Sequence, residues 1–116
     1  MSLAVHTITF DSTRPGELGR WWAKALGYEL FEEDEEGVAL RDPAGRGAGI
    51  LFLVVPEEKA VKNRMHLDLE PDDQEAEVKR LLALGARRAD VGQTGEESWV
   101  VLADPDGNEF CVLGSR

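Results

Sequence analysis

Two imidazoles and one thiol are the side chains of this sequence best suited to chemistry. His6 and His66 are the only histidines, and Cys111 is the only cysteine. Imidazole is a common metal ligand and acid–base group in proteins. Each histidine lies in a strand-like run that opens one half of the chain. This equivalent position predicts that both histidines line a common cavity. No basic neighbour of Cys111 in the sequence favours its thiolate, so packing is favoured over a nucleophilic role.

The elements that must position these residues occur twice along the chain. Each half begins with a strand, at residues 3–10 or 65–69, and continues into a helix with an apolar stripe. Pro15 and Pro71 are predicted to open the helices, and Leu-Gly dipeptides at 26–27 and 84–85 to end them. Three strands follow in each half, at 28–31, 38–41 and 50–55 and at 88–91, 99–103 and 109–113. The last two strands of each half are joined by an Asp-Pro-Xaa-Gly turn, at 42–45 and 104–107.

This repeat predicts a single α+β domain over residues 1–116, built from two tandem βαβββ modules. Module one covers 3–55, a charged linker covers 56–63, and module two covers 64–114. The strands are expected to form a curved mixed sheet, or half-open barrel, with the helices outside. Strand alternation then predicts which side chains face the cavity. They are His6, Ile8 and Phe10 on the first strand, His66 and Asp68 on the fifth, and Glu109, Cys111 and Leu113 on the last.

Composition and charge exclude several classes of protein. The 116 residues are 42% apolar and 31% charged, which is typical of a globular domain and not of a disordered chain. A formal net charge of -10 disfavours nucleic acid and anionic membranes as partners. The longest apolar run, residues 50–55, is too short to cross a bilayer. A single cysteine and the lack of a basic, then apolar leader predict a cytoplasmic protein.

Two segments carry a resemblance to a known family. They are the helix end Trp21-Trp22-Ala23-Lys24-Ala25-Leu26-Gly27-Tyr28 and the turn-strand Asp104-Pro105-Asp106-Gly107-Asn108-Glu109-Phe110. Together with the paired modules, they resemble the glyoxalase-like branch of the vicinal-oxygen-chelate superfamily over nearly the whole chain. That superfamily contains glyoxalase I, extradiol dioxygenases, epimerases, fosfomycin-modifying enzymes and metal-free proteins that sequester bleomycin. The fold therefore does not select one reaction. The resemblance also implies a homodimer.

The resemblance implies a divalent metal held by up to four side chains. His6 and His66 match the ligands that open the two modules, and imidazoles suit zinc, nickel or iron. The glutamate expected on the closing strand of module one is replaced by Leu51, Phe52 or Leu53, and the one expected on the final strand by Cys111. Cys111 as a thiolate would bias the site toward zinc, and Glu109 would have to reach back along its strand.

Two hypotheses follow for the function. In the first, the chain binds a small organic molecule without a metal, in an apolar cup whose wall is Ile8, Phe10, Phe52, Trp99 and Cys111. His6, His66 and Glu109 would orient the ligand, and His66 or Glu109 could accept a proton. In the second, the chain is a metal-dependent lyase, isomerase or dioxygenase, with zinc, nickel, manganese or iron held by His6, His66 and Cys111 or Glu109. The sequence leaves a bound metal and its absence equally open.

Overall fold

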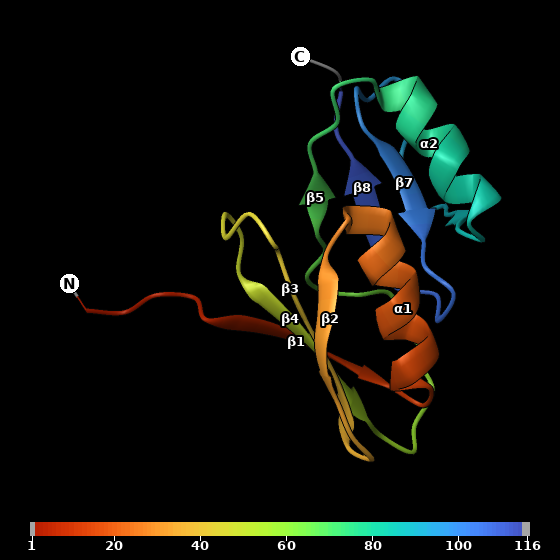
Figure 1. Cartoon of the computed structure of the whole chain (residues 1–116). Helices are drawn as coiled ribbons and strands as arrows, with labels where there is room; N and C mark the ends of the chain where they lie inside the picture. The colour runs from red at the N-terminus through yellow and green to blue at the C-terminus, as the bar shows by residue number, and fades with distance from the viewer. Residues whose placement is uncertain (1, 115–116) are drawn as a thin grey trace. The chain divides into compact units, whose positions relative to one another are not determined.

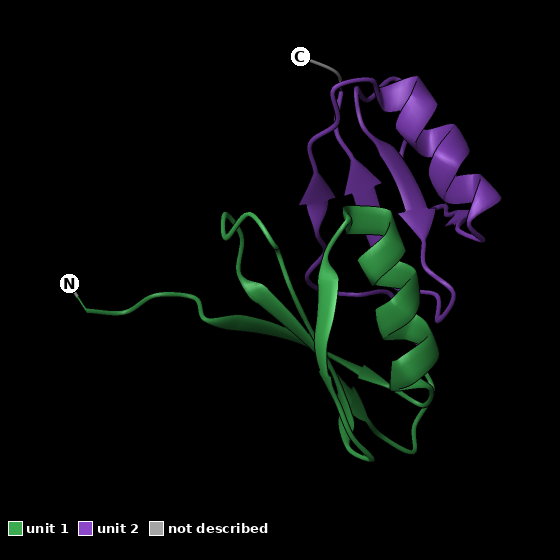
Figure 2. Cartoon of the chain, in the orientation of Figure 1, with its two compact units in different colours: residues 1–58 green, residues 59–116 purple. Residues whose placement is uncertain are grey.

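The computed structural model describes residues 2–114 and divides the chain into two compact units, Met1–Glu58 and Lys59–Arg116 (Figures 1 and 2). Unit 1 contains β1 (Thr7–Ser12), α1 (Pro15–Leu26), β2 (Glu29–Glu33), β3 (Gly37–Arg41) and β4 (Gly49–Val54). Unit 2 contains β5 (Asp68–Leu69), α2 (Gln74–Ala83), β6 (Arg87–Arg88), β7 (Val100–Ala103) and β8 (Glu109–Val112). The α+β fold with two βαβββ modules is thereby confirmed. No helix within residues 2–114 is long and apolar enough to span a bilayer.

Each unit holds one four-stranded mixed sheet, and the two sheets share one strand order. The order is β1-β4-β3-β2 in unit 1 and β5-β8-β7-β6 in unit 2. In both, the first and last strands of the module pair in parallel, and the other pairs are antiparallel. The first strand of a module thus reaches its parallel partner only after a helix and two further strands, as parallel pairing requires a long connection. The internal repeat therefore holds at the level of topology.

Both helices begin and end for local reasons that the sequence carries. Pro15 occupies the first turn of α1, where a missing amide hydrogen costs nothing. The second helix begins at Gln74 and not at Pro71, because the Asp73 carboxylate accepts a hydrogen bond from the Ala76 amide and so caps the helix. Gly27 ends α1 in the left-handed conformation, with φ of 69°.

The core of unit 1 lies between α1 and one face of its sheet. Trp22 of α1 contacts Phe10 of β1, with ring centroids 5.9 Å apart, and Phe10 contacts Phe52 of β4 at 5.2 Å. The helix approaches closely at Gly19, where an added Cβ would lie 3.0 Å from a methyl group of Val38. These contacts place the phenylalanines on the face that α1 covers.

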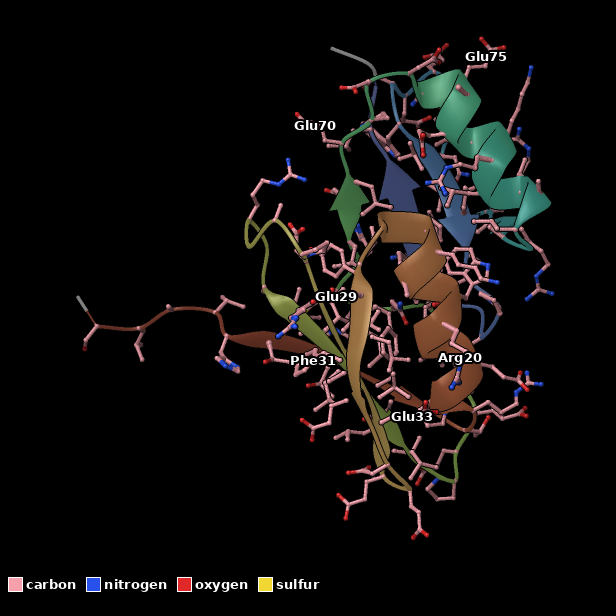
Figure 3. All side chains as sticks on the ribbon, viewed as in Figure 1. Arg20, Glu29, Phe31, Glu33, Glu70 and Glu75 are labelled. Carbon is pink, nitrogen blue, oxygen red and sulfur yellow. The ribbon has the colours of Figure 1, made fainter. Side chains whose placement is uncertain are left out.

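Charged pairs protect the outer edge of the same sheet. Every residue of β2 is exposed, and β2 is an edge strand. Arg20 of α1 donates a hydrogen bond to Glu33 over 2.6 Å (Figure 3), and Arg41 pairs with Glu29 while its guanidinium lies 5.0 Å from the centroid of the Phe31 ring. Charges along an exposed edge discourage pairing with a strand of another molecule.

The core of unit 2 follows the same plan with smaller side chains. Its members are almost completely buried residues of α2, β7 and β8, namely Val78, Leu81, Leu102, Phe110 and Val112. The turn between β7 and β8 forms as predicted, with the Gly107 amide donating to the Asp104 carbonyl over 2.8 Å. The buried Asp104 carboxylate also accepts bonds from the backbone amides of Asp106 and Asn108 and so fixes the start of β8.

Candidate functional site

A cavity of about 260 Å³ lies in unit 2. Its position follows from the alternation of side chains across three neighbouring strands. Asp68 of β5 pairs with Cys111 of β8, and Cys111 pairs with Val101 of β7, so the three residues form one row across the sheet. All three line the cavity. The residues on either side of Cys111, Phe110 and Val112, point instead into the core of the unit.

The wall of the cavity combines an apolar part with a few polar groups. The apolar part consists of Val91, Trp99, Val101, Cys111 and Leu113. The polar groups are Lys62, Asn63, His66, Asp68 and Glu109. Half of the lining residues are thus polar, but most of the surface that the wall presents is apolar. A small-molecule site usually combines such an apolar surface, which supplies affinity, with polar groups that orient the ligand.

Three of the lining residues form a cluster of possible metal ligands. One ligand atom each from His66, Asp68 and Cys111 lie within 4.8 Å of one another. The Nδ1 atom of His66 lies 2.8 Å from an oxygen of Asp68. A carboxylate on Nδ1 favours the tautomer that leaves the lone pair on Nε2, which is the arrangement of many metal-bound histidines. Nitrogen, oxygen and sulfur donors of this kind fit a zinc-like ion.

The thiol of Cys111 is held in its protonated form. Burial raises the pKa of the thiol, and the charge of Asp68 and a hydrogen bond to its carboxylate raise this pKa further, while Lys62 lowers it. Only 7% of Cys111 is exposed. The sequence-based preference for a packing role over a nucleophilic role agrees with this environment, because a nucleophile requires the thiolate. A metal bound here would have to displace the thiol proton.

Glu109 is ionised and held by two partners from the segment before β5. Partial burial opposes ionisation, but the hydrogen bonds from the Asn63 amide and the Lys59 ammonium outweigh it and lower the pKa of the Glu109 carboxyl. The distances are 2.9 Å from the Asn63 nitrogen and 3.1 Å from Lys59 Nζ. Glu109 therefore borders the cavity as one half of an ion pair.

The predicted site residues of unit 1 occupy different places from those expected. Phe52 has no exposed surface, and Phe10 packs on Trp22, so both belong to the core under α1 and not to the open face of the sheet. Ile8 pairs with Ile50 in the same register and lies on the same side as these phenylalanines. His6 precedes β1, is exposed, and its Nδ1 atom hydrogen-bonds the Thr7 hydroxyl.

Counting back from the observed helix starts pairs His66 with a residue of module one other than His6. From residue 66 to the first residue of α2 at 74 the spacing equals that from residue 7 to the first residue of α1 at 15. By position in its module, the counterpart of His66 is therefore Thr7. The resemblance pairs His6 with His66 only by allowing one extra residue between the first strand and the helix of module one. The role of His6 as a metal ligand stays a prediction.

Sequence reasoning missed the contribution of the segment that it treated as a linker. Lys59, Lys62 and Asn63 all fall within residues 56–63, yet they hold Glu109 or line the cavity. Strand alternation predicts that Asp68 shares a face with His66, but the sequence does not single out Asp68 as a partner of His66 and Cys111. The signal available was its position two residues after a histidine on a strand, which puts both side chains on one face.

Comparisons with known proteins agree with this architecture. Residues 7–113 match the family described as the glyoxalase-like domain, and the chain belongs to that family. No curated protein matches the sequence.

Several solved structures share the fold. A glyoxalase/bleomycin resistance protein/dioxygenase family enzyme from Burkholderia phytofirmans PsJN is 17% identical with a TM-score of 0.74, and the match covers 98% of this chain and 100% of that one. TnmS3, an antibiotic binding protein from Streptomyces sp. CB03234, is 19% identical with a TM-score of 0.69, covering 100% and 99%. The fosfomycin resistance protein FosX from Listeria monocytogenes, complexed with Mn(II) and a dihydroxypropylphosphonic acid, is 13% identical with a TM-score of 0.71, covering 100% and 92%.

Proposed function

We propose that this glyoxalase-like chain binds a small organic molecule in the cavity of unit 2. The observation that carries the proposal is the composition of the cavity wall, where Val91, Trp99, Val101 and Leu113 supply apolar contact beside a few polar groups. The volume of about 260 Å³ suits a small ligand. An antibiotic binding protein among the solved structures of this fold supports the same function.

The polar groups of the wall would orient such a ligand. The Nε2 atom of His66 is the ring nitrogen that Asp68 does not engage, so it can accept a proton or a hydrogen bond from the ligand. Glu109 is already paired with Lys59 and acts as a charged, fixed part of the wall. A homodimeric assembly and a cytoplasmic location stay predictions of the sequence.

The test is a fragment screen followed by amide chemical-shift perturbation in two-dimensional NMR. We expect binding fragments to shift the amides of Val101, Cys111 and Leu113. Leu113→Arg places a charged side chain in the apolar wall and should abolish these shifts, whereas Ala83→Arg on the exposed face of α2 should not. The proposal fails if fragments shift the core-facing residues equally, or if Leu113→Arg binds as the unchanged protein does.

The second candidate function is a metal-dependent lyase, isomerase or dioxygenase. The observation that favours it is the cluster of His66, Asp68 and Cys111, which supplies three donors of the types that hold zinc, nickel, manganese or iron. Asp68 adds to this cluster a carboxylate that the sequence-based ligand set did not include. When bound, such an ion supplies Lewis-acid stabilisation of negative charge on substrate oxygens. The protein's own residues would hold it and shape the apolar wall around the substrate.

Elemental analysis of protein purified without chelator or affinity metal separates the two candidates. Stoichiometric metal that is lost in Asp68→Ala and in Cys111→Ala supports the metal site. His6→Ala is the informative comparison, because metal retained in that variant would restrict the ligands to unit 2. A folded protein without bound metal, which also gains none on dialysis against zinc, would exclude the second candidate.

A further inference from the structure

We infer that the ligand of this cavity is a planar aromatic molecule that carries a negatively charged group. This inference rests on the proposed binding function and specifies the chemistry of the ligand. It is carried by two side chains of the wall, the indole of Trp99 and the ammonium of Lys62.

The indole of Trp99 is available to a ligand, unlike the other two tryptophans. Trp21 and Trp22 pack edge to face at 5.0 Å and belong to the buried core of unit 1. Trp99 is 44% exposed, and no aromatic ring of residues 2–114 stacks on it. An indole left half in water is unfavourable for so large an apolar surface, and a flat ring placed on it would remove that cost.

The aliphatic neighbours of Trp99 in the wall favour a flat ligand over a bulky polar one. Val91, Val101 and Leu113 present only hydrocarbon to the cavity. A sugar stacked on the indole would leave hydroxyl groups against these side chains without hydrogen-bond partners, which is costly. An aromatic ring has no such groups on its faces or edges.

Lys62 is the one charged side chain of the wall that no other side chain engages within the described residues. Lys59 forms an ion pair with Glu109, and Asp68 accepts hydrogen bonds from His66 and from the Cys111 thiol. Lys62 donates only a 3.3 Å bond to the Asn63 carbonyl, and it forms no ion pair within the described part of the chain. Its ammonium is thus the cation of the wall whose charge is left for a ligand.

The net charge of the protein does not oppose this preference at the site. Formal charges summing to -10 are spread over the whole chain, and salt screens exposed charges beyond about 8 Å at physiological ionic strength. Inside the cavity the Asp68 carboxylate is already engaged by His66 and the Cys111 thiol, whereas the Lys62 ammonium can pair with an anionic group of the ligand. A carboxylate and a phenolate satisfy this requirement equally, because each presents an anionic oxygen in or near the plane of a ring.

Three matched probes test the inference by titration calorimetry and by amide shifts of the cavity residues. They are 2-naphthoate, its cationic analogue 2-naphthylmethylamine, and decahydro-2-naphthoate, which keeps the charge but is neither flat nor aromatic. We expect 2-naphthoate to bind about tenfold more tightly than either analogue, a factor within the range of one stacking contact or one ion pair.

Variants assign each preference to its residue. Lys62→Gln should remove the preference for the anionic over the cationic probe, while Lys79→Gln on the exposed face of α2 should leave it unchanged. Trp99→Leu should remove the preference for the aromatic over the saturated probe, and Trp99→Phe should keep most of it.

The outcomes separate this inference from the binding function. Equal binding of all three probes in the cavity would overturn the inference and leave the binding function standing. No shift with any of them at millimolar concentration would also overturn it, and the fragment screen would then decide the binding function by itself. Preferences that persist in Lys62→Gln or Trp99→Leu would remove the assignment to these residues.

Discussion

Substitutions at two adjacent residues of β8 should have different effects, one on stability and the other on ligand binding. Phe110 is 1% exposed in the core of unit 2, whereas its neighbour Cys111 lines the cavity on the opposite face. We expect Phe110→Ala to destabilise the protein strongly, because it removes a whole ring from a core that α2 covers. Cys111→Ala should have little effect on folding, because the lost sulfur bordered a space that is already open.

The expected magnitudes differ enough to be measured. Truncating a buried phenylalanine to alanine costs about 3–5 kcal/mol through lost transfer free energy and the cavity left behind. Removing one sulfur atom from the wall costs about 1 kcal/mol by the same scale of apolar contact. With a urea dependence of about 2 kcal/mol per molar, Phe110→Ala should lower the unfolding midpoint by about 2 M.

Urea unfolding of both variants, followed by circular dichroism and by fluorescence, provides the measurement. Trp99 is the only tryptophan of residues 59–116 and reports on unit 2, whereas Trp21 and Trp22 report on unit 1. Coincident unfolding curves from circular dichroism and from fluorescence would show that the two units unfold together. A single unfolding midpoint is meaningful only in that case. If Phe110→Ala lowers the midpoint no more than Cys111→Ala, the assignment of faces on β8 is refuted.

Three further predictions concern single contacts. Since the folded-state pKa of Glu109 is lowered, its stabilisation is present above the ordinary glutamate value near 4.5 and is lost as pH falls through the folded-state pKa. Glu109→Gln should therefore be less stable than the unchanged protein at pH 7, by a margin that narrows in urea titrations at acid pH. Gly37→Ala should lower the thermal unfolding midpoint by several degrees, because the added Cβ would lie 2.0 Å from the Phe52 carbonyl oxygen. Gly27→Ala should lower the midpoint less, because its Cβ meets no atom within 4 Å and only the positive φ opposes it. Asp104→Ala should cost about 2 kcal/mol or more in chemical unfolding, because the buried carboxylate caps two backbone amides of the turn before β8. A loss no larger than that of Asp72→Ala, at an exposed aspartate, would contradict this role.

The fold could be predicted because its signals are local and occur twice. Pro15 and Gly27 bound α1 through their own backbone preferences, and the Asp-Pro-Xaa-Gly turns close through a bond between the first and last residues of each turn. The start of α2 was predicted three residues too early. A proline and an aspartate both suit a helix start, and only the bond from Ala76 to Asp73 decides between them.

The sequence predicts which residues of β8 line the cavity of unit 2, but it misplaces the apolar residues of unit 1. On β8 the alternation placed Glu109, Cys111 and Leu113 together, and all three line the cavity. On β1 the same rule grouped Ile8 with Phe10 correctly but could not say which face α1 covers. That choice depends on how Trp22 and Gly19 pack against the sheet, a contact between residues distant in sequence.

The sequence by itself determined the duplicated modules, the helix boundaries of unit 1, the turns, and the set of residues that share each strand face. These features depend on backbone preferences and on the two-residue period of a strand, which neighbouring residues decide. Only the tertiary structure decided which face is buried, that Lys59 and Asn63 hold Glu109, and that Asp68 joins His66 and Cys111. The pairing of β5 with β8 makes these contacts, and pairing between distant strands is governed by long-range packing that no local pattern records.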